Sequence, residues 1–121
     1  MKGIGIDLCC ISRMEKNLNE RFLGRCFTQE ERAYIASRAQ AGAQSAAAMW
    51  AAKEAFLKAS GAGLGGGIHL QEIGVTHAPD GAPSYALTGA AEEKMKQMGA
   101  LHAFLSITHE GDMAACVCVI E

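Results

Sequence analysis

The chain opens with a short run in which large apolar residues alternate with small or acidic ones. Between Lys2 and Cys10, the residues Ile4, Ile6 and Leu8 alternate with Gly5 and Asp7. An alternation with a period of two predicts a β-strand with one crowded face. The glycines lack the third glycine of the dinucleotide-binding fingerprint, so the run does not predict that fold.

Helical signals follow the first strand. The capping-box pattern Ser12–Glu15 predicts a helix over residues 13–23 that ends at Gly24. The same pattern recurs at Thr28–Glu31 and predicts a second helix that continues through Ile35.

The central part of the chain is rich in alanine. Residues 39–44 predict a turn, and Ser45 is then expected to cap the main helix, which continues to about Ser60. Gly61 is suited to the left-handed position just after a helix. The glycine-rich stretch 61–67 must then be a loop. Because this loop follows a helix instead of joining a strand to a helix N-terminus, it is not a Walker loop.

The second half of the chain is predicted to contain mostly strands. We expect a strand over 68–76, a turn at 79–81 and a strand over 84–87. A helix should follow from Thr88 to about Met98 and end at Gly99. Strands over 102–108 and 113–120 should then be joined by a hairpin turn at 110–112. The mixture of helices with sequential strands predicts an α+β fold with an antiparallel sheet.

Length and composition narrow the class of protein. The chain has 121 residues, of which 50% are hydrophobic and 20% charged, so we expect one folded domain, residues 1–121. The net charge of −2 gives no support to a nucleic-acid partner. No apolar run approaches the roughly 20 residues of a membrane helix. Asp7 comes too early for a signal peptide, so a cytoplasmic location is expected.

The cysteines do not suggest a disulfide framework. Their number is five, and they stand at Cys9, Cys10, Cys26, Cys116 and Cys118 without a C-x-x-C pair. We expect reduced thiols that pack as small hydrophobes. A metal site at Cys116 and Cys118 lacks a second pair of ligands at the usual spacing.

Two carboxylates are candidates for chemistry. Asp7 lies within an apolar strand, where burial of a carboxylate is costly unless it is paired or binds a metal, although a solvent-facing strand end is an alternative. Glu54 shares a helix face with Lys58, as either a weak surface ion pair or part of a ligand site beside small residues. Two carboxylates from different elements suit Mg²⁺, which takes waters and phosphate oxygens as its other ligands.

The remaining polar candidates carry less information. His109 lies at a strand end, where histidines are most often simply exposed, and a metal cluster with Glu110 and Asp112 would be too cramped in one tight turn. The other histidines, His69, His77 and His102, have no partner pattern and are expected to be structural or surface residues.

Four segments, in order, resemble the holo-[acyl-carrier-protein] synthases, the small stand-alone 4′-phosphopantetheinyl transferases. The first is Gly3-Ile-Gly-Ile-Asp7 with Arg13 after it, and the second is Phe27-Thr-Gln-Glu-Glu31. The third is Trp50-Ala-Ala-Lys-Glu-Ala-Phe56 with Lys58 to Gly63 after it, and the fourth is Ser106-Ile-Thr-His109. The resemblance covers essentially the whole chain.

The resemblance implies an activity. Such enzymes transfer 4′-phosphopantetheine from coenzyme A to a serine of an apo acyl carrier protein, release adenosine 3′,5′-bisphosphate and use Mg²⁺. It also implies a homotrimer with active sites between subunits. The resemblance does not distinguish whether the carrier protein serves fatty-acid, polyketide or other synthesis. The alternative is a non-catalytic trimer that binds coenzyme A or the carrier protein.

The resemblance also assigns roles to residues. Asp7 and Glu54 match the metal-binding carboxylates, and together with Lys58 and His109 they form the implied catalytic set. The implied coenzyme A contacts are Lys58, Gly61, Gly63, Pro83, Thr108 and His109. The base that takes the serine proton is Glu54 or a metal-bound water that it orients.

The implied carrier-binding residues are Arg13, Arg21 and Arg25, which would share one basic helix. Because this chain is slightly acidic, a local basic patch must attract an acidic carrier protein.

Two positions depart from the family pattern. Met49 stands where the family usually has Arg, so a phosphate contact is absent or comes from another residue such as Arg38. Ala62 replaces the usual threonine between two glycines and removes a hydroxyl.

Overall fold

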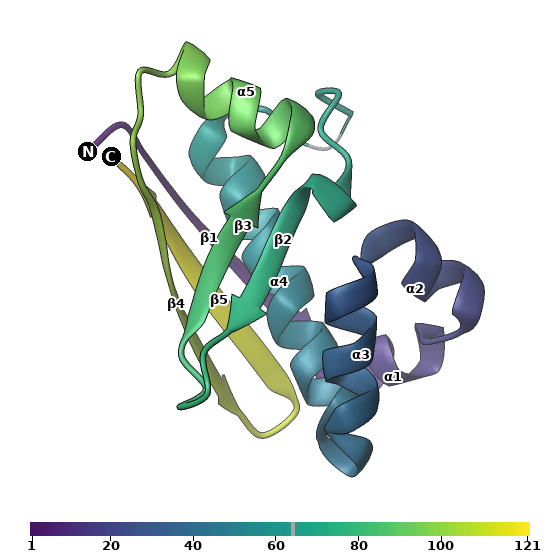
Figure 1. Ribbon diagram of the computed structural model, residues 1–121. Helices are drawn as coiled ribbons and strands as arrows, with labels where there is room; N and C mark the ends of the chain where they lie inside the picture. Colours follow the sequence, from purple (N-terminus) through teal and green to yellow (C-terminus); the bar gives the residue numbers. More distant parts are fainter. Residues whose placement is uncertain (64) are drawn as a thin grey trace.

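The computed structural model describes residues 1–63 and 65–121, and it contains helices and two antiparallel sheets (Figure 1). The helices are α1 (Ile11–Asn17), α2 (Glu20–Cys26), α3 (Gln29–Ser37), α4 (Gly42–Ser60) and α5 (Gly89–Gln97). The strands are β1 (Gly3–Cys10), β2 (Ile73–His77), β3 (Pro83–Leu87), β4 (Ala103–Glu110) and β5 (Met113–Ile120). The three-stranded sheet has the order β1-β5-β4, and β2 pairs with β3. The predicted α+β class is confirmed.

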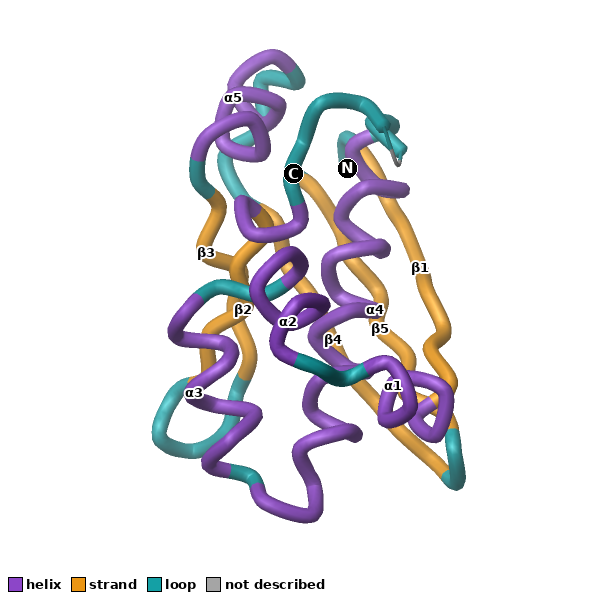
Figure 2. The backbone as a smooth tube through the Cα atoms, turned by 90° about the vertical axis from the view of Figure 1, so that its right-hand side faces the viewer, coloured by secondary structure: helices purple, strands orange, loops and turns teal. Residues whose placement is uncertain are grey.

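Helix α4 runs along one face of the three-stranded sheet, as Figure 2 shows. Gly3 and Gly5 allow this close approach, because a Cβ on either residue would overlap the backbone carbonyl oxygens of Ala59 and Ala55, respectively. The alanines of α4 that face the sheet are almost fully buried. The Gly-Ile-Gly sequence therefore serves helix–sheet packing, and Asp7 comes next on the same face of β1.

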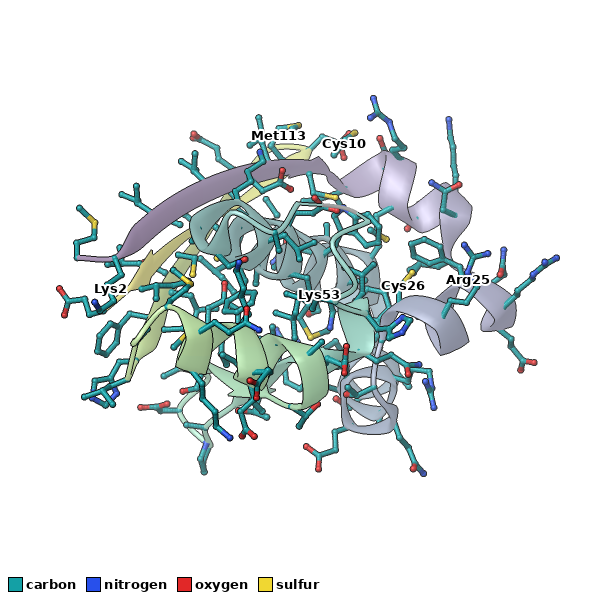
Figure 3. The ribbon with its side chains drawn as sticks, turned by 90° about the horizontal axis from the view of Figure 1, so that it is seen from above. Lys2, Cys10, Arg25, Cys26, Lys53 and Met113 are labelled. Carbon is teal, nitrogen blue, oxygen red and sulfur yellow. The ribbon has the colours of Figure 1, made fainter. Side chains whose placement is uncertain are left out.

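A buried ion pair joins α3 and α4 to β2. Lys53 Nζ lies 2.8 Å from Glu31 Oε1 and donates to the carbonyl oxygens of Leu70 and Ile73, each at 2.9 Å. Glu31 Oε2 accepts the backbone N–H of Val75 at 2.8 Å. Both charged side chains are about 99% or more buried, and Figure 3 shows Lys53 in the middle of the molecule. This network fixes the rotation of α4 about its axis.

The other face of the three-stranded sheet is apolar and open. The strand register places Ile4, Val119 and Phe104 in one row across it, and Ile6, Val117 and Ser106 in the next. Ile4, Ile6 and Leu8 are 59%, 65% and 62% exposed. No element of the described residues 1–63 and 65–121 covers this face, which we call the open sheet face.

The expected single helix over residues 13–23 is wrong, because the chain forms two short helices there. α1 ends at Asn17, and α2 begins after Asn19, whose side chain accepts the N–H of Phe22 at 2.9 Å. The polar Asn17-Leu18-Asn19 sequence favours this break, because asparagine competes for backbone hydrogen bonds. Ser12 does not form the expected capping box but binds Asp112 instead.

Other boundaries also shift. α4 begins at Gly42, so Ser45 is not its cap, and the first part of the expected strand over 68–76 is a 3₁₀ turn at Leu70–Glu72. The Thr28–Glu31 capping box, the left-handed Gly61 after α4, β3, α5 and the β4–β5 hairpin are confirmed. The five cysteines are free thiols, as expected. None of the helices in the described residues is long and apolar enough to cross a membrane.

Candidate functional site

Asp7, Glu54 and Lys58 come together where β1 lies against α4. Lys58 Nζ lies 3.2 Å from Asp7 Oδ1 and donates to the carbonyl oxygen of Ile6 at 2.9 Å. Lys58 therefore pairs with Asp7 from another element, and not with Glu54 one turn earlier on its own helix. Because Asp7 is only 16% exposed and Lys58 is 54% exposed, the carboxylate is held in place while the ammonium reaches solvent.

The charge of Asp7 acts on Glu54. Partial burial raises the pKa of Glu54 above its ordinary value, the negative charge of Asp7 raises it further, and Lys58 opposes both effects. Two like charges that are held close together disfavour each other's ionisation unless a cation lies between them. The neighbourhood of Asp7 and Glu54 is thus arranged to attract positive charge.

The donor set at Asp7 and Glu54 fits one kind of metal. Within residues 1–63 and 65–121, no group of three or more His, Cys, Asp or Glu side chains is placed to hold a metal ion. Two carboxylates alone suit a hard cation that keeps several waters and accepts phosphate oxygens, as Mg²⁺ does. Zinc prefers three or four nitrogen or sulfur ligands, which this pair does not offer.

The glycine residues after α4 lie at the end of the helix that carries Lys58. Gly61 and Gly63 have φ angles of 74° and 66°, which glycine adopts without strain. Gly61, Ala62 and Gly66 line a hollow of about 410 Å³ against Lys94 and Gln97 of α5. The part of the expected loop at Leu64 lies outside the described residues.

His109, Thr108 and Pro83 lie away from these residues. His109 Nε2 lies 3.2 Å from the side-chain nitrogen of Gln44, which precedes Lys58 by about four turns of α4, or about 21 Å. Thr108 is exposed in the same row of the sheet as Leu8, on the open sheet face. Pro83 begins β3 opposite His77.

The predicted site residues therefore form two groups at different ends of the molecule. Figure 1 shows the turns that follow β2 and β4 at the bottom and the C-terminal end of α4 at the top. Within one chain, Lys58 and His109 cannot contact the same phosphate group, because about 21 Å of helix separates Lys58 from the partner of His109.

The expected basic helix is divided between two helices. Arg13 lies on α1, whereas Arg21 and Arg25 lie on α2, and all three side chains are exposed. Arg13, Phe22 and Trp50 line one hollow of about 260 Å³, and Arg21 and Arg25 line a neighbouring one that shares Phe22 and Asn17. Figure 3 shows Arg25 on α2, at the end of the molecule away from Lys2. The three arginines thus surround one partly apolar surface.

The sequence reasoning missed the role of Lys53. The neighbours Lys53 and Glu54 have different roles, because Lys53 is buried in the core whereas Glu54 is half-buried and within electrostatic reach of Asp7. The Thr28–Glu31 capping box could have signalled that Glu31 is fixed, but not that it also binds Lys53.

The two departures from the expected pattern also have a place in the structure. Met49 is fully buried in the core, and the guanidinium of Arg38 lies 5.8 Å from the centre of the Tyr34 ring. Arg38 is therefore an exposed cation at the C-terminal end of α3 that lies over Tyr34, and its expected role as a substitute phosphate contact stays a prediction.

Comparisons with known proteins agree with the resemblance. The model of the 4′-phosphopantetheinyl transferase superfamily matches residues 3–118. The holo-[acyl-carrier-protein] synthase of Treponema denticola is 44% identical over 98% of this chain and 97% of its own length. The synthase of Gluconobacter oxydans is 50% identical over 79% of this chain and 64% of its own length.

A solved structure supports the same relationship. The Helicobacter pylori holo-[acyl-carrier-protein] synthase in complex with coenzyme A superposes with a TM-score of 0.83 at 30% identity, over 98% of this chain and 99% of that one.

Proposed function

The chain belongs to the 4′-phosphopantetheinyl transferase superfamily, and we propose that it transfers 4′-phosphopantetheine from coenzyme A to a serine hydroxyl of an apo acyl carrier protein. The observation that carries the proposal is the meeting of Asp7, Glu54 and Lys58, which lie far apart in sequence. Relatives along nearly the full chain have this activity in their names. The family model spans nearly the whole chain, which supports the expected single domain.

The reaction requires negative charge to be neutralised at phosphorus. The serine oxygen attacks the phosphorus that carries the pantetheine arm, a new O–P bond forms, and adenosine 3′,5′-bisphosphate leaves with the bridging oxygen. Lys58, whose ammonium reaches solvent beside Asp7, is placed to hold a phosphate oxygen. Glu54, a half-buried carboxylate beside Asp7 and Lys58, is placed to accept the serine proton.

Asp7 and Glu54 would hold Mg²⁺, which supplies charge stabilisation for the phosphate oxygens. Replacing either residue by alanine should abolish transfer and leave the far-ultraviolet circular dichroism spectrum unchanged. The exposed Glu30 on α3 provides the matched control, because Glu30→Ala removes a carboxylate away from the pair. Near-normal transfer by Asp7→Ala or Glu54→Ala at saturating Mg²⁺ would contradict the assignment.

A second copy of the chain would complete the site. Asp7, Glu54, Lys58, Gly61 and Gly63 form one half, and Pro83, Thr108 and His109 form the other half. The open sheet face supplies a surface for association, because Ile4, Ile6 and Leu8 present a continuous apolar patch that a monomer would leave in water. Thr108 lies at the edge of this face. These features support the expected homotrimer with sites between subunits.

Mixing two inactive variants tests the shared site. Asp7→Ala and His109→Ala should each be inactive alone, and co-expression should restore part of the activity, because some interfaces then contain two intact halves. An oligomer that contains only one of the variants has no interface with two intact halves. If co-expression restores no activity although native mass spectrometry shows mixed oligomers, both halves act within one chain and the proposal of a shared site is wrong.

The carrier protein would dock on Arg13, Arg21 and Arg25, around the hollow lined by Phe22 and Trp50. Arg21→Glu should raise the KM for the carrier protein and leave the KM for coenzyme A nearly unchanged, because exposed charges steer an acidic partner. Wild-type association should also slow as salt rises. The five free cysteines fit a reducing compartment and support the expected cytoplasmic location.

A further inference from the structure

Helix α1, which carries Arg13, begins without a cap from its own sequence. In the part of the chain that the structure describes, the side chain of the N-cap residue Cys10 accepts no backbone N–H of the first turn, although its thiol lies 3.4 Å from the Ser12 hydroxyl oxygen. The helix has seven residues, and so short a helix is unstable in water without tertiary contacts. Its buried residue, Met14, holds only one side of it against the core.

Asp112 supplies the missing cap from the turn between β4 and β5. Asp112 Oδ1 accepts the backbone N–H of Ser12 at 3.0 Å, in the first turn of α1. Asp112 Oδ2 accepts the Ser12 hydroxyl at 2.5 Å and the Cys10 thiol at 3.2 Å, and the Asp112 carbonyl oxygen accepts the N–H of Ile11 at 2.7 Å. Figure 3 shows Cys10 beside Met113, its partner in the strand register.

We propose that Asp112 is a positioning residue for carrier-protein binding, which holds α1 so that Arg13 faces the carrier. This inference rests on the proposed function, because it assigns Asp112 a role at the carrier surface. Arg13 lies between Ser12, whose backbone N–H binds Asp112, and Met14, which is buried in the core. Fixing both neighbours fixes the direction in which the Arg13 side chain leaves the helix.

The location of these bonds separates this role from a general role in folding. The three side-chain contacts of Asp112 are all exposed, and the buried core lies elsewhere, around α4 and β5. Loss of exposed hydrogen bonds changes global stability little, whereas loss of a cap releases the first turn of its helix. The effect of a substitution should therefore be local to α1.

Steady-state kinetics with an apo acyl carrier protein provide the first test. Asp112→Ala should raise the KM for the carrier by roughly fivefold, the factor that corresponds to a typical cap. The KM for coenzyme A and kcat should stay within about twofold, because the pair at Asp7 and Glu54 is untouched. Asp112→Asn keeps an oxygen that can accept the Ser12 N–H and should restore most of the affinity. Glu110→Ala removes an exposed carboxylate from the same turn and is the control.

A double variant tests whether Asp112 acts through Arg13. If it does, adding Asp112→Ala to Arg13→Ala should raise the KM for the carrier little further, whereas independent effects would multiply. An unchanged KM for the carrier in Asp112→Ala, or an equal rise of the KM for coenzyme A, would overturn the inference.

Hydrogen exchange separates this inference from the proposed function. Amides of α1 should exchange faster in Asp112→Ala than in the wild type, and those of α4 should not. If the wild type transfers no phosphopantetheine, the proposed function fails, and the inference that depends on it fails in its carrier-binding part. Unchanged exchange in α1 would overturn the inference even if transfer is normal.

Discussion

Replacing Lys53 by methionine removes the buried ammonium at the centre of the molecule and keeps a side chain of similar length. The substitution removes the ammonium donor from the carbonyl oxygens of Leu70 and Ile73, of which the first still accepts the N–H of Ile73. It also leaves Glu31 as a buried carboxylate without its cation. Burial lowers the pKa of Lys53, and the adjacent Glu31 opposes this shift. The pairing with Glu31 is therefore what keeps a charge tolerable at this depth.

The expected cost follows from the contacts that are lost and kept. Removing one partner of a buried pair costs about 3–5 kcal/mol. Glu31 keeps the backbone N–H groups of Thr28 and Val75, both at 2.8 Å, so we expect the lower end of that range, about 3 kcal/mol. This is a large part of the 5–15 kcal/mol that typically stabilises a domain.

Urea unfolding measures this cost. The fluorescence of Trp50, the only tryptophan in the chain, and far-ultraviolet circular dichroism should report the same transition. All samples need one protomer concentration, because the stability of an oligomer depends on it. Lys58→Met is the matched control, since it makes the same change on the same helix at a side chain that is 54% exposed.

We expect the control to change the free energy of unfolding by no more than about 1 kcal/mol, because the Lys58 side chain is 54% exposed and its charge is screened by solvent. If Lys53→Met costs no more than Lys58→Met, the ion pair does not hold α4 in place.

The remaining predictions concern packing, association and pH. Gly5→Val should prevent folding, because its side chain would overlap the Ala55 carbonyl oxygen. Gly24→Ala should be tolerated, since no described atom lies within 4 Å of a Cβ there, and thermal melts compare the stability of the two variants. Ile6→Asp should reduce the oligomer to monomers in light scattering, and a persisting trimer would contradict the role of the open sheet face. Hydrogen bonds from the Ser12 and Cys10 side chains lower the pKa of Asp112. The stabilisation of α1 by the Asp112 carboxylate is therefore fully present above the ordinary pKa of 3.8 and is lost as the pH falls through the lowered value. Protection of the α1 amides from hydrogen exchange should decline only under these acidic conditions.

Local patterns predicted the elements whose signals are confined to a few neighbouring residues. The Thr28–Glu31 capping box and the glycine after α4 lie where expected, because backbone donors and a left-handed φ are decided locally. The expected Ser12–Glu15 capping box is wrong because Ser12 binds Asp112, a residue 100 positions away, instead of capping its own helix. No local pattern contains that contact.

In the candidate site too, the sequence identified the residues but not the contact that the fold creates between distant elements. The resemblance named Asp7, Glu54 and Lys58, and the structure brings them together. The sequence offered a Glu54–Lys58 ion pair as one of two alternatives, but Lys58 instead binds Asp7, because the glycines of β1 bring that strand close to α4. Spacing along a helix identifies neighbours on that helix and cannot identify a competing partner from a strand.

The central claim is the transfer of 4′-phosphopantetheine by a site built on Asp7, Glu54 and Lys58. Its most direct test is the intact mass of an apo acyl carrier protein after incubation with the wild-type chain, coenzyme A and Mg²⁺, with Glu54→Ala as the paired reaction. We predict that the carrier gains the mass of one phosphopantetheine arm with the wild type and gains nothing with Glu54→Ala. A carrier of unchanged mass with the wild type, or an equal gain with both proteins, would contradict the claim.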